Sequence, residues 1–124
     1  MKRTIFAIAV SCATILTSAY AKDFSGLKPG LYQAGKDGCA HPSGVGTFVF
    51  DGKNFSGNHQ ICHTKRIDGK NRYRTLCMDT MGGGKSEATF ASDPDKESFD
   101  LTIKKTGSKS FTVNGEEYFF CEKL

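Results

Sequence analysis

Residues 97–122 read ESFDLTIKKTGSKSFTVNGEEYFFCE, and this stretch indicates the fold class. At its start, the apolar residues Phe99, Leu101 and Ile103 alternate with polar residues, which is typical of a strand with one buried face. Asn114-Gly115 then separates two further short runs, and this dipeptide readily adopts the positive φ angles of a tight hairpin turn. We therefore expect antiparallel strands whose aromatic and aliphatic side chains form the core.

The rest of the chain repeats short β-rich runs between turn residues. Asp-Gly-Lys-Asn occurs at residues 51–54 and again at residues 68–71, and Asp-Gly favours tight hairpin turns. Across the first turn, Phe48 and Phe50 are expected to join Phe55. The pattern predicts strands at residues 30–34, 45–50, 54–64, 71–78, 86–91, 97–104, 109–114 and 116–122. The expected fold is all-β, a small antiparallel meander of seven or eight short strands closed as a barrel or a curled sandwich.

The N-terminal residues have the features of a cleaved export signal. Two basic residues precede a mostly apolar run from Ile5 to Leu16, and Ala19-Tyr20-Ala21 forms an A-x-A cleavage site. The run is too short to span a bilayer, and a lipoprotein cut before Cys12 would leave an even shorter apolar run ahead of the cut. We expect residues 1–21 to be a signal peptide and residues 22–124 to be a single domain that is periplasmic or secreted.

The composition excludes several classes of protein. The chain has 124 residues, of which 38% are hydrophobic and 24% charged, unlike a disordered chain or a transmembrane bundle. Removal of Lys2 and Arg3 lowers the count of Lys and Arg from 17 to 15 against 13 acidic residues, so the net charge falls from +4 to +2. This charge gives no reason to expect nucleic-acid binding, which needs a clustered basic surface.

Four cysteines remain after the expected cleavage: Cys39, Cys62, Cys77 and Cys121. An even number of cysteines in a short exported domain predicts two disulfides. A zinc site is disfavoured because the sequence has no Cys-x-x-Cys motif. In both registers that the turn at residues 68–71 allows, Cys62 and Cys77 share one face of a hairpin, either directly opposite or diagonal. The pairs Cys62–Cys77 and Cys39–Cys121 are therefore favoured over the other two connectivities.

No set of residues points to catalysis or to a cofactor. On a strand, His59 and His63 would lie about 13 Å apart, too far to share a metal ion, and nothing places His41 beside them. Cysteines in disulfides are not nucleophiles, and no Gly-x-Ser-x-Gly motif is present. The run from Gly82 to Lys85 lacks the spacing of a phosphate-binding loop and is expected to be a loop tip. We expect no catalytic residues, no metal and no cofactor.

The hairpin around residue 68 contains the predicted partner-binding residues. Lys65 lies opposite Arg74 in one register and opposite Arg72 in the other, and like charges directly across a strand pair are destabilising. Lys70 adds a positive charge in the turn. Because such conflicts often mark functional surfaces, these four residues are candidate contacts for an acidic protein patch or an anionic envelope component. The alternative is that they only prevent edge-to-edge association of sheets.

Together these patterns predict a non-enzymatic exported binding protein. The first hypothesis is an inhibitor or immunity-type factor that acts on another exported protein. The alternative is a small-ligand or lipid carrier with a lipocalin-like cavity, and a minimal hydrolase ranks last. Nine phenylalanines in residues 22–124 would largely fill a barrel of eight short strands. An apolar pocket of at least about 300 Å³ would therefore favour the carrier.

Overall fold

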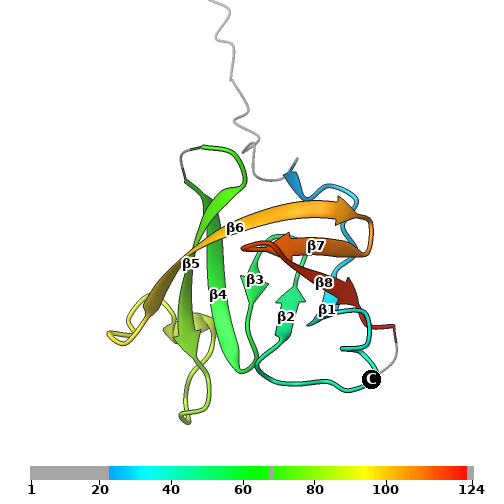
Figure 1. The fold of residues 1–124 in the computed structure, drawn as a ribbon. Helices are drawn as coiled ribbons and strands as arrows, with labels where there is room; N and C mark the ends of the chain where they lie inside the picture. The colour runs from blue at the N-terminus through cyan, green and yellow to red at the C-terminus, as the bar shows by residue number, and fades with distance from the viewer. Residues whose placement is uncertain (1–22, 68, 123–124) are drawn as a thin grey trace, which may run out of the picture.

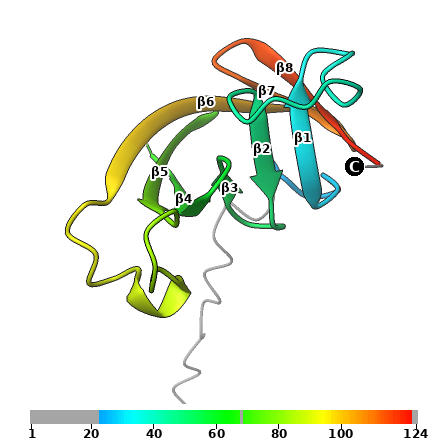
Figure 2. The ribbon, with the colours of Figure 1, turned by 90° about the horizontal axis from the view of Figure 1, so that it is seen from below.

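The computed structural model describes residues 23–67 and 69–122, which form a curled antiparallel sheet (Figure 1). Its strands are β1 Gly30–Ala34, β2 Thr47–Phe50, β3 Phe55–Ser56, β4 Gln60–Arg66, β5 Arg72–Asp79, β6 Glu97–Gly107, β7 Ser110–Val113 and β8 Glu116–Phe120. The predicted all-β meander is confirmed, and Figure 2 shows that it is a nearly closed barrel. The expected signal peptide, residues 1–21, lies outside the described residues. Within the described ranges, no helix has the length and apolar character needed to cross a membrane.

The strands follow one another around the barrel. Their order in the sheet is β3-β2-β1-β8-β7-β6-β5-β4, so every neighbouring pair except β1 and β8 is consecutive in the chain. Strands β1 and β8 join the first and last parts of the sheet, with Tyr32 opposite Phe120. Strands β3 and β4 are the two edges of the sheet, and they face each other without a backbone ladder. The barrel is therefore open at the seam between β3 and β4.

Side chains bridge this seam. The backbone N–H of Phe55 donates to Thr64 Oγ1 at 3.0 Å, and the N–H of Thr64 donates to Asn54 Oδ1 at 2.9 Å. Thr64 is buried and donates in turn to Thr75 Oγ1 on β5 at 3.1 Å. These bonds satisfy backbone donors at sheet edges that would otherwise lack partners.

The strand predicted at residues 54–64 is broken into β3 and β4. Between them, the N–H of Gly57 donates to Gln60 Oε1 at 3.1 Å, and His59 adopts a positive φ of 55°. A residue with positive φ turns the chain and cannot continue an extended strand. The apolar alternation on either side of residues 57–59 therefore belongs to two strands.

The strand predicted at residues 86–91 is wrong. Residues Glu87–Thr89 form a short 3₁₀ helix, η1. The N–H of Ser86 donates to Thr89 Oγ1 at 2.9 Å, and the N–H of Thr89 donates to Ser86 O at 3.0 Å. Hydrogen bonds between a Ser/Thr pair and the local backbone compete with extended structure, which explains the helical turn.

Both predicted disulfides are confirmed. Cys39 is bonded to Cys121, and Cys62 is bonded to Cys77. In the β4–β5 hairpin Cys62 lies directly opposite Cys77, which is the register in which residues 68–71 form the whole loop. The Cys39–Cys121 bond joins the loop after β1 to the end of β8 across a sequence separation of 82. It thus links the beginning and the end of the strand series.

Aromatic side chains fill one end of the barrel. Phe24 precedes β1, and its ring centroid lies 4.8 Å from that of Phe55 and 5.0 Å from that of Tyr73. Phe50 stacks on Phe55 at 4.7 Å, as expected from the turn at residues 51–54. The largest fully buried side chains are Tyr32, Phe50, Phe55, Tyr73, Met78, Ile103 and Phe111. All of these except Met78 belong to one hydrophobic cluster, which packs this end of the barrel.

Candidate functional site

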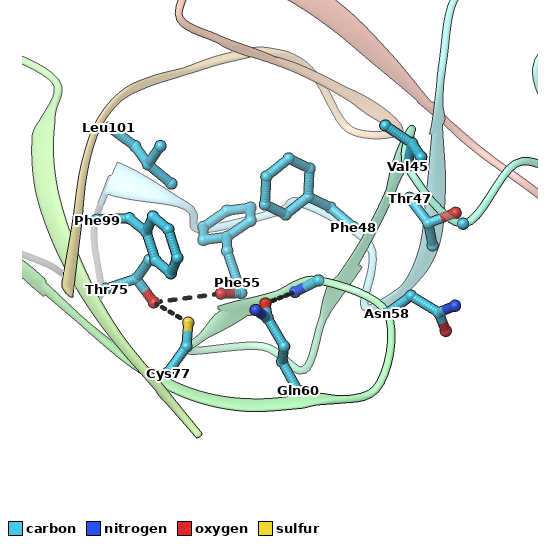
Figure 3. Close-up of a pocket in the computed structure, with 12 residues that line it drawn as sticks. Val45, Thr47, Phe48, Phe55, Asn58, Gln60, Thr75, Cys77, Phe99 and Leu101 are labelled. Carbon is cyan, nitrogen blue, oxygen red and sulfur yellow. Dashed lines mark hydrogen bonds between the residues drawn. The ribbon is translucent and has the colours of Figure 1, made fainter. Parts of the chain in front are cut away.

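The other end of the barrel contains an apolar cavity, which we call the cup (Figure 3). Its volume is about 320 Å³. It forms where the loop before β2, the turn between β3 and β4, and parts of β5 and β6 meet. The labelled residues that line it are Val45, Thr47, Phe48, Phe55, Asn58, Gln60, Thr75, Cys77, Phe99 and Leu101.

Aromatic rings make up much of the wall. In Figure 3 the rings of Phe48, Phe55 and Phe99 gather around the cup. Phe55 is fully buried at the base, whereas Phe99 is 38% exposed. At the mouth, Val45 is 98% exposed. The aromatic core therefore continues into the cup, where part of its surface is exposed to solvent.

The threonines of the cup use their hydroxyl groups within the protein. Thr75 Oγ1 accepts a hydrogen bond from Thr64 and donates to a backbone oxygen of β3 at 3.4 Å. Thr47 Oγ1 accepts from Gln33 Nε2 at 2.6 Å and donates to Ser43 O at 2.5 Å. Because both hydroxyls are bonded already, neither needs a partner from a ligand.

Gln60 brings an amide group with a free donor to the cup. Its Oε1 accepts the N–H of Gly57, which identifies the oxygen end of the amide. Its Nε2 donates to no residue in 23–67 or 69–122, and the side chain is half-buried. In Figure 3 Gln60 points from the turn toward Phe55, whereas Asn58 lies on the other side of the turn, where its side chain is beside Gly44.

The cup carries no formal charge. All twelve of its lining residues are uncharged. Two exposed carboxylates lie at the same end of the sheet: Asp79 is paired in register with Gln60, and Glu97 with Cys77. Lys85 interacts electrostatically with Asp79, so a cation lies near one of these carboxylates.

A second hollow, of about 400 Å³, lies along the seam between β3 and β4. Asp51 contributes to its lining, and its Oδ1 accepts the N–H groups of Lys53 and Asn54 at 2.8 and 2.5 Å. Glu87, which also lines the hollow, pairs with His63. Because these polar groups already bond to their neighbours, the cup is the stronger candidate for a ligand site.

The predicted partner-binding residues lie on the outer face and tip of the β4–β5 hairpin, away from the cup. Lys65 is directly opposite Arg74, as one predicted register requires. Arg74 forms an ion pair with Asp100 at 2.7 Å, and its hydrogen bond lowers the pKa of the Asp100 carboxyl below the usual value. Lys65, Lys70 and Arg72 are exposed. The negative charge of Asp100 offsets part of the repulsion between Lys65 and Arg74. Partner binding by the four predicted residues stays a prediction.

The histidines lie in three different segments. His63 is on β4, where its ring stacks on Phe90 with centroids 3.9 Å apart. His59 is in the turn before β4, and His41 is in the loop between β1 and β2. Among residues 23–67 and 69–122, no group of three or more His, Cys, Asp and Glu side chains is placed to hold a metal ion.

Sequence reasoning places Phe99 in the core and does not predict the cup. The alternation around Phe99 identifies its inward side, but it carries no information about what covers that side. One usable signal is Val45, which stands between Gly44 and Gly46. A β-branched apolar residue between two glycines has no large neighbours in sequence to shield it. In the structure Val45 lies just before β2, whereas the strand predicted at residues 45–50 begins with it.

Comparisons with known proteins identify no relative. No protein-family model, no curated protein and no solved structure matches the chain. The geometry of the cup is therefore the basis for inferring function.

Proposed function

We propose that this protein is an exported, non-enzymatic binding protein that carries a small apolar ligand in the cup. The supporting observation is a cavity of about 320 Å³ with aromatic walls and an open mouth. This volume falls at the lower end of the range for small-molecule sites, about 300–1,000 Å³. It also exceeds about 300 Å³, the pocket volume above which a carrier is favoured over an inhibitor. The carrier is therefore the preferred hypothesis.

Burial of apolar surface supplies the driving force for binding. A ligand in the cup covers the exposed parts of Phe99 and Val45 while its own apolar surface leaves water. Each ~100 Å² of apolar surface buried in this way contributes roughly 2.5 kcal/mol. The cup is formed by strands and by a turn that Gln60 closes, so little of the protein must become ordered on binding.

A neutral fluorescent probe tests the proposal. N-phenylnaphthylamine brightens in apolar surroundings, and we expect saturable binding to the purified oxidised protein. The Phe99→Ala variant removes one wall of the cup, so affinity should fall about tenfold. The matched control is Met81→Ala, because Met81 is 76% exposed but does not line the cup.

The two variants separate a specific site from general stickiness. Unchanged probe binding in Met81→Ala together with loss in Phe99→Ala supports the cup as the site. Equal loss in both variants, or no saturable binding to the unaltered protein, contradicts the carrier proposal.

A second candidate function is capture of another exported protein through the same end of the barrel. The observation that favours it is the 98% exposure of Val45 beside the partly exposed Phe99. A partner would insert an apolar side chain into the cup. In that case Val45→Asp should abolish a stoichiometric complex on gel filtration, and the partner should displace the fluorescent probe.

Export is part of the proposal. Two disulfides are typical of oxidising compartments such as the periplasm or the extracellular medium. Cell fractionation followed by thiol titration tests this. Recovery of an oxidised protein from the periplasm or medium supports export, and a reduced cytosolic protein contradicts it.

A further inference from the structure

We propose that the cup selects uncharged ligands that present one hydrogen-bond acceptor, such as a ketone, ester or amide carbonyl, on a largely aromatic body. Gln60 supplies the donor. This inference rests on the proposed carrier function and adds the chemical class of the ligand to it.

The orientation of the Gln60 amide determines what the ligand must offer. Because Gly57 N–H occupies Gln60 Oε1, the oxygen is bound to the turn and the NH₂ group remains for a ligand. The lining hydroxyls of Thr47 and Thr75 are already bonded within the protein. A ligand that covers Gln60 without accepting its N–H would leave a dehydrated donor unpaired, which weakens binding. An acceptor on the ligand removes that penalty.

The absence of charge among the twelve lining residues determines the ionic state of the ligand. A carboxylate in the cup would lose its hydration without gaining a cationic partner. A protonated amine would likewise lose hydration, and no lining residue offers it a carboxylate. Neutral ligands are therefore favoured over both.

The three rings of the wall determine the shape of the apolar body. Phe48, Phe55 and Phe99 come from β2, β3 and β6 and surround the cup from different sides (Figure 3). Aromatic groups pack on one another with offset or edge-to-face geometry, and such pairs stabilise a complex by more than the free energy expected from their buried area. A flat ring in the cup can meet more than one of these phenylalanines.

Four matched compounds test the inference. Benzophenone is neutral and has one carbonyl group. The matched hydrocarbon is the diphenylethylene with both rings on one carbon, in which a CH₂ group takes the place of the carbonyl oxygen. Diphenylacetate is the anion, and benzhydrylamine is the cation at neutral pH. We would titrate each into the isotope-labelled oxidised protein and follow the backbone amide signals of residues 44–60 and 97–101 by NMR. We expect benzophenone to bind at least tenfold more tightly than either charged compound.

Two variants identify the donor. Gln60→Met removes the NH₂ group, so the preference for benzophenone over diphenylethylene should fall roughly fivefold. Gln60→Glu keeps an oxygen for Gly57 N–H but introduces a carboxylate, so benzhydrylamine should gain at least tenfold over benzophenone. Asn58→Ser is the control, because Asn58 also lines the cup but lies across the turn from Gln60. The ratio of two affinities within each variant cancels any loss of folded protein, since that loss affects both ligands equally.

The outcomes distinguish the two proposals. If none of the four compounds nor the fluorescent probe binds, the carrier function fails. If they bind but diphenylacetate or benzhydrylamine binds best, the carrier function stands and the ligand class is wrong. If Gln60→Met keeps the preference for the ketone, or Asn58→Ser removes it, Gln60 is not the donor.

Discussion

The inner face of β6 contributes to the core at one end and to the cup at the other. Ile103 is fully buried, Leu101 is half-buried and Phe99 is 38% exposed, although the three side chains alternate onto the same face. Ile103 belongs to the cluster that Phe24 covers, whereas Phe99 lies at the mouth of the cup. Alternation therefore sets the side to which a residue points, and coverage by distant segments sets how deeply it is buried.

The largest expected effect compares the two ends of β6 directly. Ile103→Ala should lower the free energy of unfolding by about 2–5 kcal/mol because it leaves a cavity in a packed core. Phe99→Ala should lower it by less than about 1 kcal/mol, because the ring is partly exposed and has solvent on one side. Urea denaturation followed by circular dichroism measures both. Equal losses for the two variants would show that the cup is closed in solution.

An intermediate effect is expected at the seam between β3 and β4. Thr64→Val keeps the shape of the side chain but leaves the N–H of Phe55 and the hydroxyl of Thr75 without Thr64 Oγ1, which should cost about 1–3 kcal/mol. Thr102→Val is the control, since Thr102 is exposed on β6 and should change stability by less than about 0.5 kcal/mol. If the two variants unfold at the same urea concentration, the seam is not held by Thr64.

The smallest effect concerns the segment between β5 and β6, which lies at the open end. The hydrogen bond from Lys85 lowers the pKa of the buried Asp93 carboxyl, and the N–H of Asp95, which donates at 2.7 Å, lowers it further. A carboxyl whose pKa is lower in the folded state stabilises the fold above its unfolded pKa of about 4, and this contribution is lost as the pH falls below that value. The thermal midpoint should therefore be flat above about pH 5 and decrease toward pH 3.

Substitution of Lys85 or Asp93 tests whether their ion pair causes part of this pH dependence. Asp93→Asn and Lys85→Met should each reduce the loss of thermal stability between about pH 5 and pH 3. A remaining slope is expected, because ion pairs also lower the pKa values of Asp100 and Glu122. A pH profile that neither substitution alters would show that the Lys85–Asp93 pair does not stabilise the open end.

Much of the fold could be predicted because its signals are local. Asn114 and Gly115 have the positive φ angles of 51° and 86° that their sequence favours. The pairing of Cys62 with Cys77 follows from counting residues across one turn. The failures have local causes of another kind: at residues 57–59 and 86–89, side-chain bonds to the backbone replaced extended structure.

The site could not be predicted to the same extent. Its residues come from four separate parts of the chain, and their approach depends on the curl of the whole sheet. The cationic residues at the β4–β5 hairpin are conspicuous in sequence because they are close together along the chain. The role of Gln60 has no such signal, since it depends on the hydrogen bond that turns its oxygen toward Gly57.

The sequence by itself determined most of the strands and their turns and the two disulfide pairs, because each follows from the spacing of residues a short distance apart or from elimination among four cysteines. Only the tertiary structure decided which end of the barrel is filled and which is open. The reason is that burial depends on what segments distant in sequence bring to a surface. Phe24 covers one end, whereas the described segments leave Phe99 38% exposed at the other.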